Sequence, residues 1–435
     1  FLICIFWGII LIGGQMLFLC QFGLSVPAAF WGATFNSPSL VDFSKWIISP
    51  FGIFVLGSIV IAADCIFTMF SLAVITKILR AMFLISLFGI PVVYCGQLLL
   101  TSNQAFVSAF NNYASQQGLA VTYQGVIDAA RAAGAALPPP NLAASVSAVG
   151  LTWFFFSGTF APYLAGEMKN VKGTMAISVI GAYVVAAVCM IAIGVLTYNV
   201  FGYQFISATS YLFYSGAPGN PIPLPPTVYY LISILNPNPL FVGFISLCLV
   251  LNVLLLNICA ILVVTRIIFA WAFDRVIPTK IADVSDRLHA PYVSPILAMI
   301  GGIISLWAFN YTPLFAFWIN PTIGFTLGFI VVAIAAAVFP FTRKEMFEAS
   351  PRIAKLRVGG VPVMTILGVA CAIVLSWAAY LGYTIPALSG PTSAQAFMVI
   401  VGVVVAGIII YSASYYYNRS KGIDLSLLFK EIPPE

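Results

Sequence analysis

The chain has 435 residues, of which 62% are hydrophobic and only 7% are charged, and its mean hydropathy is +1.07. Soluble domains carry roughly 25% charged residues, so this composition excludes a soluble domain and predicts an all-α polytopic membrane protein in a lipid bilayer. The net charge of +6 does not indicate nucleic-acid binding, because basic residues of integral membrane proteins usually hold cytoplasmic loops beside anionic lipid.

About ten stretches are long and apolar enough to cross a bilayer, whose hydrocarbon core of about 30 Å needs about 20 helical residues. Proline and glycine stand at several of their boundaries. In chain order the stretches cover residues 1–24, 50–76, 79–101, 148–166, 173–200, 239–273, 293–309, 314–341, 361–387 and 394–417.

The basic residues indicate how these stretches are oriented. All but two of the 18 lysines and arginines fall in loops on one side of the alternating layout, and the exceptions are Lys45 and Arg131. Cytoplasmic loops hold the excess of Lys and Arg. We therefore predict a multi-pass protein of the cell membrane with its C-terminus in the cytoplasm.

Two long loops on the other side carry almost no charge. Residues 102–147 contain only Asp128 and Arg131 as charged residues, and residues 203–238 contain none. Compact caps and mobile tethers both fit this pattern. Asn310 begins an Asn-Tyr-Thr glycosylation acceptor in a shorter outer loop, where modification is the less favoured outcome.

Asp64 lies near the centre of the apolar stretch 50–76. An ionised carboxylate at the middle of a membrane costs at least about 2.5 kcal/mol, so this side chain should face a cavity or be protonated. Two interpretations remain open. Asp64 is either a site that couples transport to protons or another cation, or a neutral residue hydrogen-bonded to a neighbouring helix.

The stretch 148–166 is interrupted at its middle by Ser157-Gly158-Thr159, between Phe156 and Phe160. Backbone groups cannot remain unpaired in lipid, so such a segment persists only where it lines a protein cavity. Its freed N–H and C=O groups can meet the carboxylate and ammonium of a zwitterion. We predict that these five residues bind the substrate and that the two phenylalanines occlude it.

Four further polar residues interrupt apolar stretches. Ser246, Asn252 and Asn257 lie in residues 239–273, and Asn320 precedes a proline in residues 314–341. They are candidates for lining a polar pathway, although hydrogen bonding between helices is the commoner role of such residues.

The sequence lacks the usual signatures of catalysis and of metal binding. His289 is the only histidine, which excludes a bis-histidine haem within this chain. No HExxH, P-loop or nucleophile-elbow motif occurs, and the cysteines have no metal-binding spacing. We therefore expect no enzyme activity, no cofactor and no bound metal.

Two segments resemble the amino acid permeases of the amino acid, polyamine and organocation transporter superfamily. Phe155-Phe156-Ser157-Gly158-Thr159-Phe160, followed by Ala165-Gly166-Glu167-Met168-Lys169-Asn170, is similar to that family's aromatic-Gly-Phe-Glu break and its following Ala-Glu-Glu-x-Lys-Asn. Arg266, followed by Ala272-Phe273-Asp274-Arg275-Val276-Ile277-Pro278, is similar to the family's Arg…Ala-x-Asp-Gly-x-x-Pro.

The resemblance implies a fold of two inverted five-helix repeats followed by two accessory helices. In the family the first motif belongs to helix six, so we expect the first two helices to be absent from this chain. The implied divisions are residues 1–101 as the remainder of the first repeat, 102–147 as an extracellular loop, 148–341 as the second repeat, 342–360 as a cytoplasmic loop, 361–418 as the accessory helices and 419–435 as a cytoplasmic tail.

The chain departs from the family pattern at three places. Thr159 or Phe160 replaces the acid of the Gly-Phe-Glu step, and Arg275 stands where glycine is usual. The stretch 79–101 lacks the membrane lysine that some sodium-independent relatives use as a substitute cation. Asp64 therefore becomes the leading titratable candidate.

From these features we predict a secondary active transporter that imports neutral or weakly charged amino acids by alternating access. Coupling is expected to be to protons, with sodium as the alternative ion, and Arg266 and Asp274 would form a cytoplasmic gate. The alternative is a non-transporting membrane scaffold or accessory subunit with membrane partner subunits. A proton-translocating redox subunit would need a chain of buried ionisable residues, which one aspartate does not provide.

Overall fold

The computed structural model describes residues 2–70, 72–119, 121–137, 163, 171–216, 225–285, 291–312, 319–384, 393–423 and 425. Within these ranges the chain is mainly helical, and β1 (Arg357–Val358) pairs with β2 (Val361–Pro362) in one antiparallel hairpin. The long helices are α1 (Leu2–Phe18), α4 (Pro50–Thr68), α5 (Leu72–Leu87), α10 (Val171–Phe201), α13 (Pro239–Phe273), α14 (Val293–Tyr311), α15 (Ile319–Thr342), α17 (Val363–Thr384) and α19 (Ser393–Ser420).

Shorter helices extend or connect these long ones. Two are π-helical turns, η1 (Leu19–Leu24) and η2 (Phe88–Tyr94), and one is the 3₁₀ turn η4 (Thr279–Ala282). The others are α2 (Ser25–Thr34), α3 (Pro38–Ile47), α6 (Cys95–Leu99), α7 (Asn103–Gln116), α8 (Tyr123–Ala132), α11 (Tyr203–Ser215), α12 (Val228–Leu235) and α16 (Lys344–Ala349).

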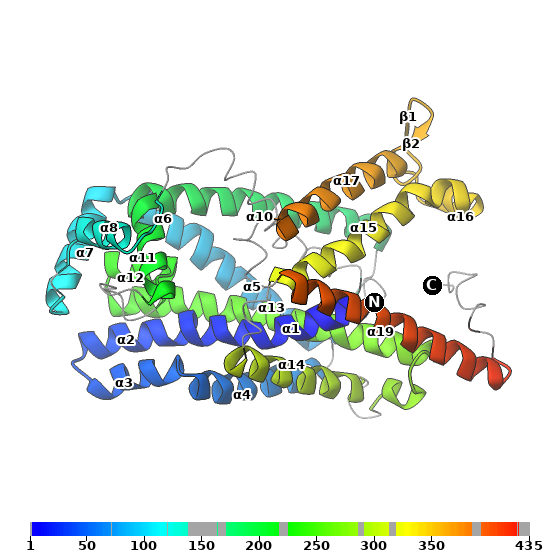
Figure 1. The fold of residues 1–435 in the computed structure, drawn as a ribbon, viewed down its shortest axis with the longest axis horizontal. Helices are drawn as coiled ribbons and strands as arrows, with labels where there is room; N and C mark the ends of the chain where they lie inside the picture. Colours follow the sequence, from blue (N-terminus) through cyan, green and yellow to red (C-terminus); the bar gives the residue numbers. More distant parts are fainter. Residues whose placement is uncertain are drawn as a thin grey trace.

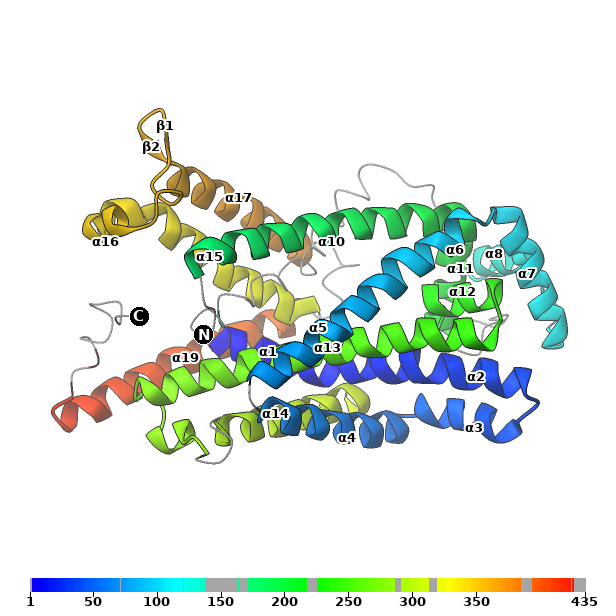
Figure 2. The ribbon, with the colours of Figure 1, turned by 180° about the vertical axis from the view of Figure 1, so that it is seen from behind.

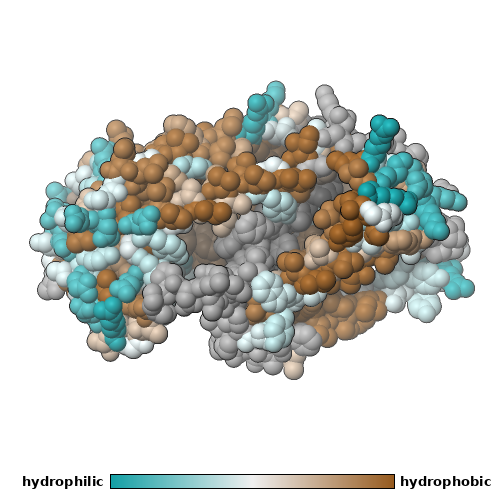
Figure 3. Space-filling model, turned by 90° about the horizontal axis from the view of Figure 1, so that it is seen from above, coloured by the Kyte–Doolittle hydropathy of each residue, from teal (hydrophilic) through white to brown (hydrophobic). Residues whose placement is uncertain are grey.

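Eight helical segments of the described chain are long and apolar enough to cross a membrane. They are Cys4–Thr34, Pro50–Thr68, Ala73–Leu99, Ile177–Phe201, Pro239–Phe273, Val293–Tyr311, Val363–Leu381 and Met398–Ser420. Figure 3 shows hydrophobic residues over the middle of the molecule and hydrophilic residues towards its two ends. The prediction of an all-α, multi-pass membrane protein is confirmed at this level.

Two of the ten predicted stretches have no counterpart among these eight. The stretch 314–341 corresponds to α15, whose described apolar part, Thr326–Thr342, is a shorter helix. The stretch 148–166 lies outside the described residues, apart from Tyr163.

Two predicted boundaries were wrong. The stretch 50–76 is broken, because α4 ends at Thr68, where the Met69 N–H bonds to the carbonyls of Ile66 and Phe67 and tightens the last turn. The first stretch was predicted to end at residue 24, but the π-turn η1 leads directly into α2, so the helical segment continues to Thr34.

Helices α1, α4, α13 and α14 pack against one another at the centre of the molecule. Their main core cluster includes Ile12, Ile61, Ile261 and Leu306, all fully buried. The helices approach closely because glycines lie at the contacts. A Cβ added at Gly13 of α1 would lie 2.6 Å from the backbone nitrogen of Leu306 in α14. Small residues at the contacts are how membrane helices gain van der Waals packing, since lipid supplies no hydrophobic force between helices.

Helices α1 and α13 lie side by side and run in opposite directions (Figure 1). Each of these two helices also packs against the pair of long helices that comes after its neighbour in the sequence. Helix α1 contacts α14 and α15, and α13 contacts α4 and α5. The rear view shows α5 crossing the bundle diagonally and α10 running along its edge (Figure 2). The helices α1, α4 and α5 therefore correspond in order to α13, α14 and α15. Each contact between two of these six helices has a counterpart between the two corresponding helices.

The low-charge loops form a compact cap at one end of the bundle (Figure 1). Helices α7, α8, α11 and α12 share a second core cluster, in which Phe106, Phe110 and Phe205 are fully buried. Tyr123 stacks on Phe205 with ring centroids 4.4 Å apart. Of the two alternatives left open by the sequence, the described parts of these loops are caps rather than tethers, because aromatic burial offsets the entropy of ordering them.

The opposite end carries α16, the β1–β2 hairpin, η4 and the end of α19 (Figure 1). Arg343, Lys344, Arg357 and Arg419 belong to these elements or adjoin them, whereas Lys45 and Arg131 lie in α3 and α8 at the cap end. The charge asymmetry predicted along the sequence thus becomes an asymmetry between the two ends of the bundle.

The outer loop predicted to present Asn310 is helical at this residue. Asn310 lies in the last turn of α14, and its amide nitrogen is buried. A glycosylation acceptor must be exposed on the surface. The structure therefore gives the acceptor motif no support.

Candidate functional site

A buried pair of polar side chains joins α4 to α13 at the centre of the bundle. The Nδ2 of Asn257 donates a hydrogen bond to Oδ2 of Asp64 at 2.6 Å. Asp64 is 6% exposed and Asn257 is fully buried. The sequence identified both residues as candidates for different roles, and the fold brings them together from positions 193 residues apart.

Helix α4 positions Asp64 from both of its ends. At the start, Pro50 occupies the first turn and the Ser49 hydroxyl accepts a hydrogen bond from the Gly52 N–H at 3.0 Å, which caps the helix. Near the other end, the Cys65 thiol donates to the carbonyl of Pro295 in α14 at 3.2 Å. These contacts fix the rotation of α4, so that Asp64 faces α13.

Asp64 was predicted near the centre of its apolar stretch, but it lies near the end of its helix. Because α4 ends at Thr68, Asp64 lies about one turn, or roughly 6 Å, from the helix end. Its partner Asn257 lies near the middle of α13, a helix of 35 residues that is about 50 Å long. Asp64 is therefore close to the end of a short helix but level with the middle of the longest one.

Among the described residues, three buried oxygens without a hydrogen-bond partner occur on α13 and α14, one of them in the pair itself. Within the described structure, Oδ1 of Asn257 has none, and neither do the hydroxyls of Thr265 in α13 and Ser294 in α14. Each unpaired buried acceptor or donor costs about 1–3 kcal/mol. Such groups in a native fold indicate a place where a proton, an ion or water can be bound.

The other polar residues predicted on α13 are separated from this pair. Ser246 is buried about three turns nearer the start of the helix, and Asn252 is exposed on a different face. The interval of five residues between Asn252 and Asn257 turns the side chain by about 140°. The structure does not bring these candidates to one site.

The two predicted gate residues lie at different heights on α13. Arg266 is partly buried within the helix, whereas Asp274 is its C-cap residue. Their separation of eight residues corresponds to about 12 Å along the axis. Partial burial raises the pKa of the Asp274 carboxyl above its ordinary value. The assignment of these two residues to a cytoplasmic gate stays a prediction.

The end of α13 is held by α19, which the sequence did not predict. Arg275 has a φ of 58°, in the left-handed region that favours glycine, and it occupies the position after the C-cap. Its carbonyl accepts hydrogen bonds from the Ser414 hydroxyl at 3.1 Å and from the Asn418 amide at 3.0 Å. The departure from the expected glycine is thus accommodated by a backbone conformation that α19 stabilises.

The predicted substrate residues Phe156, Ser157, Gly158, Thr159 and Phe160 lie outside the described residues. Asn320 lies in the first turn of α15, and its side chain is outside the described part of the structure. The geometry of the site is therefore defined by the pair of Asp64 and Asn257.

Replacing Asn257 by leucine should lower the free energy of unfolding by about 2 kcal/mol, because it leaves the buried Asp64 carboxyl without its partner. Replacing both residues by leucine should recover most of this loss, since no polar group then remains unpaired. Equilibrium unfolding in bicelles measures both effects. Additive losses in the single and double variants would show that the two side chains do not interact.

A scan against protein-family models, a search of curated proteins and a search of solved structures each find no match to this chain.

Proposed function

We propose that the protein is a secondary active transporter that imports neutral or weakly charged amino acids across the cell membrane by alternating access, driven by protons. The observation that carries the proposal is the hydrogen bond between Asp64 and Asn257, at the middle of α13. An ionisable residue buried among membrane helices is costly, and function is the usual reason that it is kept.

The chemistry of the pair suits a protonation switch. An ionised Asp64 accepts a hydrogen bond from the Asn257 amide nitrogen, which is the arrangement observed. A protonated Asp64 is instead a donor, and rotation of the amide by 180° would present Oδ1 of Asn257 to it. This oxygen has no partner among the described residues. The pair can thus remain hydrogen-bonded in both protonation states of Asp64. The change of charge and of amide orientation occurs at the contact between α4 and α13.

The arrangement of the central helices supports alternating access. Two long helices of opposite direction, α1 and α13, each pack on the helices that follow the other. Two inverted repeats, as proposed here, would produce this correspondence between the two sets of helices. Rocking one repeat against the other would open a central site to each side of the membrane in turn. In the proposal the substrate meets the Ser157-Gly158-Thr159 break, and the C-terminus faces the cytoplasm.

Uptake of labelled amino acids into proteoliposomes tests the proposal. We expect at least one neutral amino acid to accumulate when an inward proton gradient is applied and to equilibrate without accumulation when the gradient is absent. A sodium gradient in place of the proton gradient tests the alternative ion. If no amino acid of a broad panel is taken up or exchanged and a membrane partner co-purifies, the scaffold alternative is favoured.

A further inference from the structure

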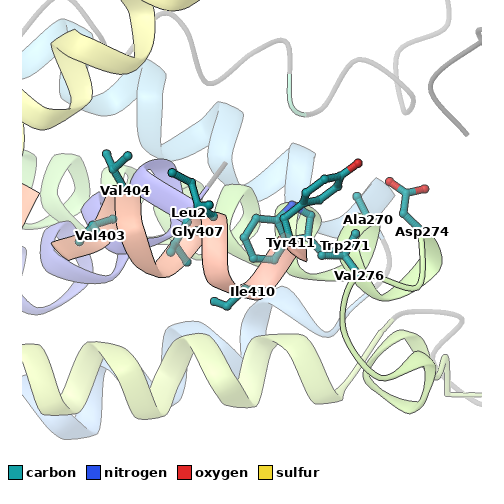
Figure 4. Close-up of a pocket in the computed structure, with 11 residues that line it drawn as sticks. Leu2, Ala270, Trp271, Asp274, Val276, Val403, Val404, Gly407, Ile410 and Tyr411 are labelled. Atoms are coloured by element: carbon teal, nitrogen blue, oxygen red, sulfur yellow. The ribbon is translucent and has the colours of Figure 1, made fainter. Parts of the chain in front are cut away.

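An apolar groove opens between α19, the start of α1 and the end of α13 (Figure 4). Its volume is about 650 Å³. The walls are formed by aliphatic side chains such as Leu2, Val404 and Ile408, and by Trp271 and Gly407. A cavity of this size and composition is large enough for a lipid acyl chain and offers it only apolar contacts along most of its length.

One end of the groove is polar. Figure 4 shows the carboxylate of Asp274 and the hydroxyl of Tyr411 at the same end, beyond the aliphatic walls. Asp274 is half-buried, and within the described structure it forms no ion pair. The next residue, Arg275, is exposed, and its backbone is fixed against α19 by Ser414 and Asn418. A negative residue that lines the groove is therefore followed directly in the chain by an exposed positive one.

The side chains of α19 show at which depth this mouth lies. The helix exposes aliphatic residues from Val399 to Ile409. Tyr411, Tyr416 and Tyr417 are exposed further along, and Arg419 follows them. Tyrosines gather at the level of the lipid headgroups, and basic residues lie just beyond them on the cytoplasmic side. The polar end of the groove is thus at the headgroup level, and its apolar part is level with the acyl chains.

We propose that this groove binds one phospholipid with a primary amine headgroup, of the phosphatidylethanolamine type, with an acyl chain along α19, its ammonium group on Asp274 and its phosphate on Arg275. The adjacent opposite charges complement a zwitterionic headgroup. A primary ammonium donates three hydrogen bonds to a carboxylate. A quaternary choline headgroup donates none, so the groove should distinguish the two lipids.

The test is lipid retention by the purified whole chain, measured by native mass spectrometry after exchange into vesicles containing equal amounts of phosphatidylethanolamine and phosphatidylcholine. We expect one tightly retained lipid, with the ethanolamine form in at least fivefold excess. Asp274→Asn should reduce this preference to less than twofold, because the ammonium loses its ionic partner.

Gly407→Leu should reduce the retained lipid at least fivefold by filling the groove, since a Cβ at this position already lies 3.7 Å from Leu2. Gly402→Leu is the matched control on the same helix, where an added Cβ meets nothing within 4 Å, and it should leave retention unchanged. Circular dichroism verifies that both variants are folded. If Gly407→Leu does not fold, the Asp274→Asn variant still tests the proposal.

Three results would overturn the proposal. The first is equal retention of both lipids by the unaltered protein. The second is equal loss of lipid in the Gly402→Leu and Gly407→Leu variants. The third is a dimer that separates in Gly407→Leu without releasing lipid, which would assign the groove to a second copy of the chain. None of these measurements depends on transport.

Discussion

In the Asp64→Asn variant we expect amino acid uptake driven by a proton gradient to fall to the background of empty liposomes, while exchange of internal for external amino acid continues. Asparagine has nearly the same shape as aspartate and still offers an oxygen to Nδ2 of Asn257, so the hydrogen bond between α4 and α13 is retained. The variant cannot bind or release a proton at this position. It therefore removes coupling and leaves the packing of the two helices intact.

Two controls make this result specific. Asp42→Asn removes the same charge from α3 at the cap end, where the side chain is 77% exposed and pairs with Lys45, and it should transport as the unaltered protein does. The stability of Asp64→Asn should change by no more than about 1 kcal/mol, the usual range for a hydrogen bond between membrane helices. Gradient-driven accumulation by Asp64→Asn would contradict the assignment of coupling to Asp64.

Replacing Gly13 by alanine should lower the free energy of unfolding by about 3 kcal/mol, at the upper end of the cost of overpacking a core. The new Cβ would lie 2.6 Å from the backbone nitrogen of Leu306 and 2.9 Å from the carbonyl oxygen of Gly302. These are backbone atoms of α14, so no side-chain rotation relieves the clash. Helices α1 and α14 would have to separate, and the core between them would loosen.

Gly194→Ala in α10 is the control for this prediction. A Cβ at Gly194 meets nothing within 4 Å, so the change should stabilise the protein by up to about 1 kcal/mol through the higher helix propensity of alanine. Unfolding of both variants in bicelles, followed by tryptophan fluorescence, measures the difference. Similar small effects at the two positions would show that α1 and α14 do not approach as closely as described.

Several helix starts in the cap have a recognisable signal in the sequence. Ser102, Thr122 and Thr227 each accept a hydrogen bond from the backbone N–H three residues later, and they start α7, α8 and α12. Serine and threonine before an amphipathic run are a known signal for the start of a helix. Within the low-charge loops these residues favour ordered caps over mobile tethers.

Other features had no signal in the sequence. Nothing near Ser414 or Asn418 indicates that they bind the carbonyl of Arg275, about 140 residues earlier in the chain. The π-turn η1 follows the same apolar pattern as the helix before it, so continuation of the first span to Thr34 was not predicted. These properties depend on which helices become neighbours and not on local propensity.

The sequence by itself determined the membrane class, the order of the apolar helices and the concentration of basic residues at one end. These properties follow from transfer free energies, which each segment carries independently of the others. It also identified Asp64 and Asn257 individually, because a polar residue within an apolar run is conspicuous wherever it packs. The tertiary structure alone decided that these two side chains meet, since their contact requires a particular rotation of α4 and α13. For α4 that rotation is fixed by contacts with its neighbours such as the hydrogen bond from the Cys65 thiol to the carbonyl of Pro295 in α14.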